Sequence, residues 1–165
     1  MDTAEKAMFL GHVSIFAEVH ADVLFAVSKH MEEVALRPGQ VVFRKGDSAS
    51  CLYIVTEGKV KVEDPDTGVF YNYLRVFDVF GEMGMVDEAP RMATVSAVEE
   101  SLLLKLDRDV FLQIMTVEDR VALGVIKVLS RHLRERAFDI RAGQLEGDRL
   151  RELAELTQQA KNSPP

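Results

Sequence analysis

The chain has 165 residues and a mass of 18.5 kDa, the size of one ordinary domain with at most a short appendage. Apolar residues make up 47% of it, too many for a disordered chain, and its net charge of −7 lacks the basic excess typical of nucleic-acid binders. The apolar run 121–129 contains Lys127 and is shorter than the roughly 18 residues of a membrane helix, and no basic signal-peptide region opens the chain. Because Cys51 is the single cysteine, an internal disulfide framework is excluded, and we expect a soluble cytoplasmic protein without a membrane or nucleic-acid partner.

Residues 1–30 carry apolar side chains at helical spacing. Phe9, Val13 and Phe16 lie three or four residues apart, and a second apolar run follows at Val23–Val27. We therefore expect an N-terminal helical segment.

Between Val34 and Leu106 the pattern changes to short apolar runs that are separated by turn residues. Two of these runs are Val41–Phe43 and Cys51–Val55, and the sequence Asp64-Pro65-Asp66-Thr67-Gly68 is typical of a hairpin turn. Many short strands at intervals of about ten residues predict a β-sandwich, a barrel or a jelly roll.

Helical spacing returns after Asp107, first around Phe111 and then over 121–133. An amphipathic tail is marked by three leucines: Leu150, Leu153 and Leu156. We expect an α+β fold in which a β-jelly-roll body with lid helices, residues 31–138, precedes a helical tail, residues 139–165. Unpaired, the leucine stripe would leave apolar surface exposed, so we also expect a homodimer or a protein partner at the C-terminal helices.

The stretch 80–95 combines residue types that suit an anion. Gly81 and Gly84 allow a ligand to approach the backbone, and a helical turn there would present free N–H groups. Arg91 follows after a loop, and its planar guanidinium suits bidentate contact with a phosphate. Glu82 can accept a hydrogen bond from a sugar hydroxyl. These residues predict a pocket for one anionic group that is joined to a sugar.

The same stretch resembles the phosphate-binding cassette of the cyclic nucleotide-binding domain family, which includes catabolite activator proteins and regulatory subunits of protein kinase A. The family pattern F-G-E-[LM]-x-[LM], a short loop and P-R-x-A-[TS]-V is matched from Phe80 to Val95. Matches to two upstream patterns of the family are Gly39, Val42, Phe43, Gly46, Asp47, Leu52, Tyr53, Ile54, Val55, Gly58 and Val60. The resemblance covers residues 8–138 and implies a jelly roll that binds a cyclic nucleotide.

The resemblance also implies roles for individual residues. Glu82 would accept a hydrogen bond from the ribose 2′-hydroxyl, and Arg91 would pair with the cyclic phosphate. The backbone N–H groups of Gly84 and Met92 would add phosphate contacts. The same turn would be lined by Gly81, Met83 and Ala93.

For the base, the family implies an apolar wall and a cap. Val62 and Leu74 lie on strands that the family uses for the wall. A C-terminal helix would cap the base, and the candidate face of that helix bears Leu129, His132, Leu133 and Arg136.

Two departures from the family pattern bear on the ligand and its loop. The family often has Gly-Asp shortly before the cassette, where this chain has Phe77 and Asp78, and we expect a reshaped turn. The residue after the arginine is Met92, whereas a serine or threonine there can bond the guanine amino group of cGMP. This favours cAMP over cGMP.

No pattern in the sequence supplies a nucleophile with a base, and the four histidines lack the spacing of metal ligands, so we expect no catalytic residue, metal or cofactor. The leading interpretation is a non-catalytic cyclic-nucleotide sensor without its own DNA-binding or catalytic domain. The alternatives are an interaction module that kept the fold and lost the ligand, a fragment of a transcription regulator, and, disfavoured by the scattered histidines, a cupin-like enzyme.

Overall fold

The computed structural model describes residues 1–134. The chain divides into two compact units, Met1–Val128 and Leu129–Pro165. The predicted tail over 139–165, with its leucine stripe, lies outside the described residues. Within residues 1–134, no helix is long and apolar enough to cross a membrane.

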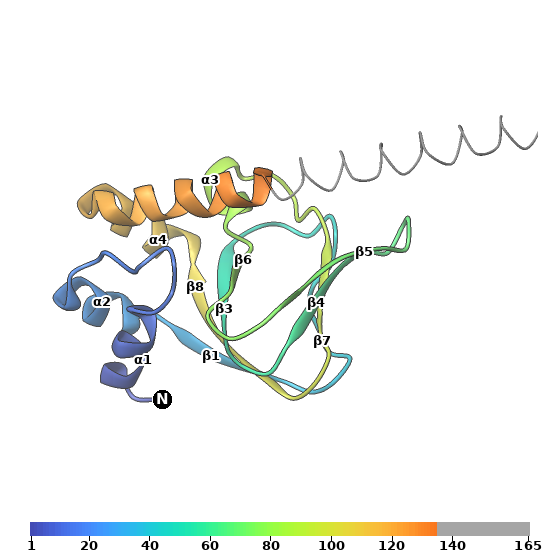
Figure 1. Cartoon of the computed structure of the whole chain (residues 1–165), viewed down its shortest axis with the longest axis horizontal. Helices are drawn as coiled ribbons and strands as arrows, with labels where there is room; N and C mark the ends of the chain where they lie inside the picture. Colours follow the sequence, from blue (N-terminus) through green and yellow to red (C-terminus); the bar gives the residue numbers. More distant parts are fainter. Residues whose placement is uncertain (135–165) are drawn as a thin grey trace, which may run out of the picture. The chain divides into compact units, whose positions relative to one another are not determined.

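Two four-stranded antiparallel sheets form the body of the first unit (Figure 1). Their orders are β1-β8-β3-β6 and β2-β7-β4-β5. The first sheet contains β1 (Glu32–Leu36), β3 (Cys51–Glu57), β6 (Val79–Phe80) and β8 (Ser101–Asp107). The second contains β2 (Val41–Phe43), β4 (Val60–Asp64), β5 (Val69–Leu74) and β7 (Thr94–Ala97). Helices precede and follow the strands, so the prediction of an α+β jelly-roll fold is confirmed.

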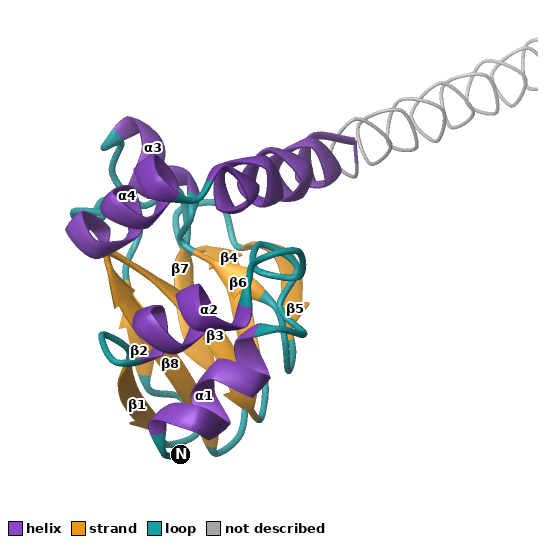
Figure 2. Ribbon diagram, turned by 90° about the vertical axis from the view of Figure 1, so that its left-hand side faces the viewer, coloured by secondary structure: helices purple, strands orange, loops and turns teal. Residues whose placement is uncertain are grey.

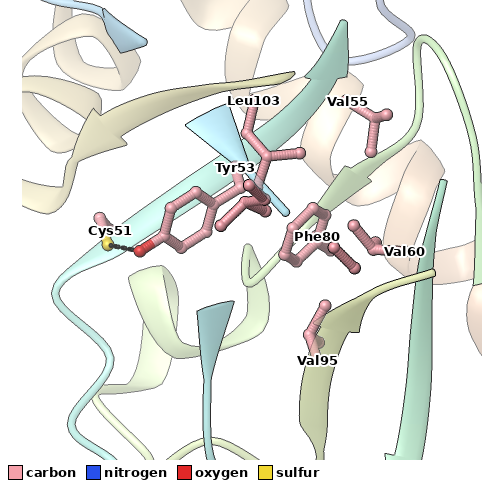
Figure 3. Packing of buried hydrophobic residues seen from close by; sticks show 9 residues of the cluster. Cys51, Tyr53, Val55, Val60, Phe80, Val95 and Leu103 are labelled. Atoms are coloured by element: carbon pink, nitrogen blue, oxygen red, sulfur yellow. Dashed lines mark hydrogen bonds between the residues drawn. The ribbon is translucent and has the colours of Figure 1, made fainter. Parts of the chain in front are cut away.

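The core between the sheets is built around aromatic rings (Figure 3). The rings of Tyr53 and Phe80 stack with centroids 5.3 Å apart, and the ring of Phe43 lies 6.0 and 5.9 Å from them. Aliphatic members of the cluster are Leu36, Val55, Val60, Val95, Ala97 and Leu103. Burial and a hydrogen bond with Cys51 raise the pKa of Tyr53, so its hydroxyl stays protonated inside the core.

The predicted hairpin turn joins β4 to β5. The N–H of Gly68 donates to the carbonyl of Asp64 at 2.8 Å, and Gly68 has φ +70°. The Asp64 carboxylate accepts from Lys45 Nζ at 2.9 Å and from the N–H of Asp66 at 3.0 Å, and these bonds lower the pKa of Asp64. The stability that this carboxylate contributes is therefore present above its unfolded-state pKa and is lost as the pH falls through its folded-state pKa.

The N-terminal region forms two short helices, α1 (Thr3–Leu10) and α2 (Ala21–Ser28), which lie over the sheet that contains β3 and β8 (Figure 2). The apolar spacing of Phe9, Val13 and Phe16 predicts helix beyond Leu10, but residues 11–19 form turns. The N–H of Gly11 closes α1 by donating to the carbonyl of Ala7, and glycine is a poor helix former. The turns nevertheless bury Val13 and Phe16. The spacing of the apolar residues therefore indicates which side chains are buried, and it does not indicate a helix.

Two further helices lie at one end of the sandwich (Figures 1 and 2), and Arg108 links them. They are α3 (Met83–Asp87) and α4 (Arg108–Val117). Arg108 Nε donates to the carbonyl of Met85 at 3.1 Å, and its Nη2 lies 2.7 Å from a carboxylate oxygen of Glu88. Helical backbone resumes at residue 119 and continues to residue 134.

Phe111 anchors α4 to the body, since its side chain is fully buried. We expect Phe111→Ala to lower the free energy of unfolding by about 3–5 kcal/mol, because truncation of a buried ring leaves a cavity. Denaturant unfolding followed by circular dichroism measures this. The matched control is Gln113→Ala on the exposed face of the same helix, which should change stability by less than about 0.5 kcal/mol. Equal effects of the two substitutions would contradict the role of Phe111.

Candidate functional site

Gly81 turns the chain from β6 into α3. Its φ is +83°, a conformation that favours glycine, and a Cβ at this position would lie 2.5 Å from Nη1 of Arg91. The glycine therefore satisfies a backbone requirement and leaves room for the arginine.

Gly84 lies buried in the first turn of α3. Its φ is not positive, so the reason for glycine is close packing rather than backbone conformation. A Cβ there would collide with the side chain of Ala49 and would lie 3.1 Å from the carbonyl oxygen of Ala89. The short helix thus packs tightly against the segment that leads into β3.

The backbone of Arg91 is anchored by a turn that lies more than 40 residues earlier in the chain. The N–H of Arg91 donates to the carbonyl of Asp47 at 2.9 Å, and the N–H of Gly46 donates to the carbonyl of Arg91 at 2.8 Å. Gly46 has φ +89°, and the Asp47 carboxylate accepts from the N–H of Arg44 at 2.8 Å. The turn that the sequence shows as Gly46-Asp47 therefore positions the arginine.

The Arg91 side chain is buried, with 6% of its surface exposed. Its Nη1 donates to the carbonyl of Gly81 at 3.0 Å, its Nη2 donates to the carbonyl of Cys51, and its Cζ lies 4.2 Å from the ring centroid of Phe43. Nε of Arg91 is buried and has no hydrogen-bond partner among residues 1–134. Buried polar groups are usually hydrogen-bonded, so this donor and the charge beside it suit an anionic ligand.

Glu82 is the second charged residue that the cassette buries. It is 3% exposed and stands immediately before α3, one residue after the glycine whose carbonyl holds Arg91. A carboxylate has several acceptor positions, and one of them could take a hydrogen bond from a ligand hydroxyl. The structure therefore brings the predicted acceptor and the predicted cation to one end of the sandwich.

The other cassette residues lie around this pair with different exposure. Met83 and Met92 are 45% and 67% exposed, so only their backbone could belong to a buried phosphate site. Ala93 is half-buried and leads into β7.

The residues predicted for the wall and the cap fall in different parts of the chain. Val62 on β4 and Leu74 on β5 are half-buried and pack against the aromatic core cluster. The predicted cap residues Leu129, His132 and Leu133 belong to the second unit, and Arg136 lies outside the described residues. The cap over a base therefore stays a prediction.

Two contacts of the site were not predicted from the sequence. The carbonyl of Cys51 and the ring of Phe43 both hold the guanidinium of Arg91. A contact between a strand end and a distant arginine leaves no local spacing signal, because it depends on which strands become neighbours in the folded chain. The upstream family pattern includes Phe43 but assigns it no role.

Two surface hollows are present, and neither is lined by Glu82 or Arg91. One is on the outer face of the second sheet beside Lys45 and Lys61, and the other lies beside Ser50 and Arg108. Within residues 1–134, no group of three or more His, Cys, Asp or Glu side chains could hold a metal ion.

Residues 33–118 match the family model described as the cyclic nucleotide-binding domain. The chain is 28% identical over 128 residues to the CRP-like cAMP-activated global transcriptional regulator of Mycobacterium tuberculosis, and the match covers 76% of this chain and 57% of that protein. It is 32% identical over 109 residues to the cAMP-dependent protein kinase regulatory subunit of Dictyostelium discoideum, covering 62% of this chain and 33% of that protein.

The structure is also similar to the crystal structure of the catabolite activator protein of Thermus thermophilus. The TM-score is 0.70 at 28% identity, over 77% of this chain and 61% of that one. The chain thus spans less than two thirds of the length of each of these three proteins.

The tight packing of Gly84 against Ala49 can be tested by a rescue. We expect Gly84→Ala to lower the free energy of unfolding by about 1–3 kcal/mol, because the added methyl group overpacks the contact. Removing the opposing methyl group, in the double variant Ala49→Gly with Gly84→Ala, should recover most of this loss in denaturant unfolding. A double variant that is less stable than Gly84→Ala by the full effect of Ala49→Gly alone would show that the two sites do not touch.

Proposed function

The chain belongs to the cyclic nucleotide-binding domain family, and we propose that it is a non-catalytic sensor that binds cAMP at Arg91 and Glu82. The observation that carries the proposal is the buried guanidinium of Arg91, with an unpartnered Nε, close to the end of the sandwich that buries Glu82. One end of the body thus offers a desolvated cation for a phosphate and a carboxylate for a sugar hydroxyl.

Phosphate binding rests on the partners of Arg91. The guanidinium is held by neutral groups, the carbonyls of Gly81 and Cys51 and the ring of Phe43. An anion adds a full opposite charge that a neutral carbonyl lacks, and phosphate oxygens can accept two parallel N–H bonds from the planar guanidinium. A cyclic phosphate would therefore bind at Nε and compete for the donors that now hold the two carbonyls.

If a phosphate replaces the carbonyls as the partner of Arg91, ligand binding can change the conformation of the chain. The carbonyl of Gly81 belongs to the turn before α3, and α3 is tied to α4 through Arg108. A ligand that loosens the bond to Gly81 would favour another position of α3 and of the helices that follow Asp107. The shift can be no larger than the difference in affinity for the two positions. We propose that a protein partner or a second copy of this chain binds these helices and responds to their position.

Preference for cAMP over cGMP rests on Met92, because its side chain offers no hydroxyl to a guanine amino group. Two similar proteins carry cAMP in their names, the regulator of Mycobacterium tuberculosis and the kinase subunit of Dictyostelium discoideum. We propose that cGMP binds more weakly.

Arg91 gives the first test of the site. We expect Arg91→Ala to weaken cAMP binding at least about tenfold in isothermal titration calorimetry, since the phosphate loses a charge-assisted pair. Arg91→Lys, which keeps the charge and loses the planar fork, should fall between the wild type and Arg91→Ala. The control is Arg37→Ala on an exposed turn, which should bind as the wild type does. Unchanged affinity in folded Arg91→Ala would disprove the proposal.

The role of Glu82 is tested through the ligand, without a substitution that could disturb α3. We expect 2′-deoxy-cAMP to bind at least about tenfold more weakly than cAMP, because the carboxylate loses its hydroxyl partner and stays buried. Competition of both compounds against a fluorescent cAMP analogue measures the ratio. Equal affinities would remove Glu82 from the site.

A further inference from the structure

Phe77 occupies a backbone conformation that its side chain disfavours. Its φ is +75°, in the left-handed region that glycine favours and bulky residues rarely adopt. It lies in the turn between β5 and β6. The pattern of the cyclic nucleotide-binding domain family often has glycine at this position. This chain therefore keeps the glycine-like turn while carrying a large aromatic ring on it.

The ring of Phe77 packs against the N-terminal helical region. It stacks on Phe9 of α1 with centroids 4.7 Å apart and an interplanar angle of 23°, and it lies 5.7 Å from the ring of His12. Stacked aromatic pairs are stabilising beyond the area that they bury. The stack thus offsets the strain at Phe77 and joins α1 to a turn that lies almost 70 residues later in the chain.

The backbone around Phe77 sets where β6 begins. The N–H of Phe77 donates to the carbonyl of Val55 at 3.0 Å, and the N–H of Val55 donates to the carbonyl of Asp78 at 3.0 Å. β6 then has only two residues, and Phe80 pairs with Tyr53. A strand this short depends on its turn for register, and a slip of one residue would turn Phe80 away from the core.

The residues after β6 form the ligand site. Gly81, whose carbonyl holds Arg91, follows Phe80 directly, and the buried Glu82 comes next. The position of the turn at Phe77 therefore determines where both groups stand.

We propose that Phe77 is a positioning residue for the ligand site, and that its stack on Phe9 makes α1 part of the support of the cassette. The inference rests on the proposed binding of cAMP at Arg91 and Glu82. Without the ring of Phe9, the strained turn relaxes toward a negative φ, the start of β6 shifts, and the cassette binds cAMP less well. If residue 77 is glycine, the turn is unstrained and no longer needs Phe9.

A double-mutant cycle on the full chain tests this, with cAMP affinity measured by calorimetry. We expect Phe9→Ala to raise the Kd roughly three- to tenfold when residue 77 is phenylalanine, the range of a stacked pair. In the Phe77→Gly background, Phe9→Ala should change the Kd less than about twofold, relative to the Kd of the Phe77→Gly variant itself. Phe9→Tyr keeps an aromatic ring and should bind as the wild type does. Phe9→Leu replaces Phe9→Ala if the latter does not fold.

An equal effect of Phe9→Ala in both backgrounds, or an effect in neither, would overturn the inference, because Phe9 would then act independently of the turn. Hydrogen exchange gives a readout without ligand. Phe9→Ala should speed exchange of the Val55 amide, which bonds Asp78, in the wild-type background and leave it unchanged in the Phe77→Gly background. If the wild type fails to bind cAMP while exchange shows this pattern, the proposed function is wrong and the coupling of α1 to the turn stands.

Discussion

The buried guanidinium of Arg91 is held by the carbonyls of Gly81 and Cys51 and by the ring of Phe43. A cation in this position has lost most of its water, and neutral partners offset only part of that loss. Much of the nearby architecture serves to place this one group. The turn at Gly46 and Asp47 fixes its backbone, and the aromatic core supplies the ring beneath it. The negative net charge of the chain is compatible with an anionic ligand, because the charge that matters is local and desolvated.

The strands could be predicted from the sequence because turn residues separate them, and the Asp64–Gly68 turn shows this most directly. The N-terminal helix was predicted too long. Val13 and Phe16 are buried whether the chain is helical or turned, and apolar spacing does not distinguish the two. Glu82 and Arg91 could be found because their motif is local.

The carbonyl of Cys51 and the ring of Phe43 could not be found in this way. Their contacts with Arg91 arise from the pairing of strands that are far apart in the chain. Phe77 shows a related limit, since its departure from the family pattern was visible but its partner was not. A residue that breaks a local backbone rule stays in place only when tertiary contacts compensate, and here the compensation comes from α1.

The pair of backbone bonds between Arg91 and the Gly46-Asp47 turn has a consequence for the loop at 88–90. Because the backbone of Arg91 is fixed by a turn outside this loop, we expect the position of its guanidinium to depend little on the length of the loop. Glu88 and Pro90 are exposed, so added residues would extend into solvent. A longer loop should therefore leave the Arg91 guanidinium in place, and an engineer could insert a reporter domain there.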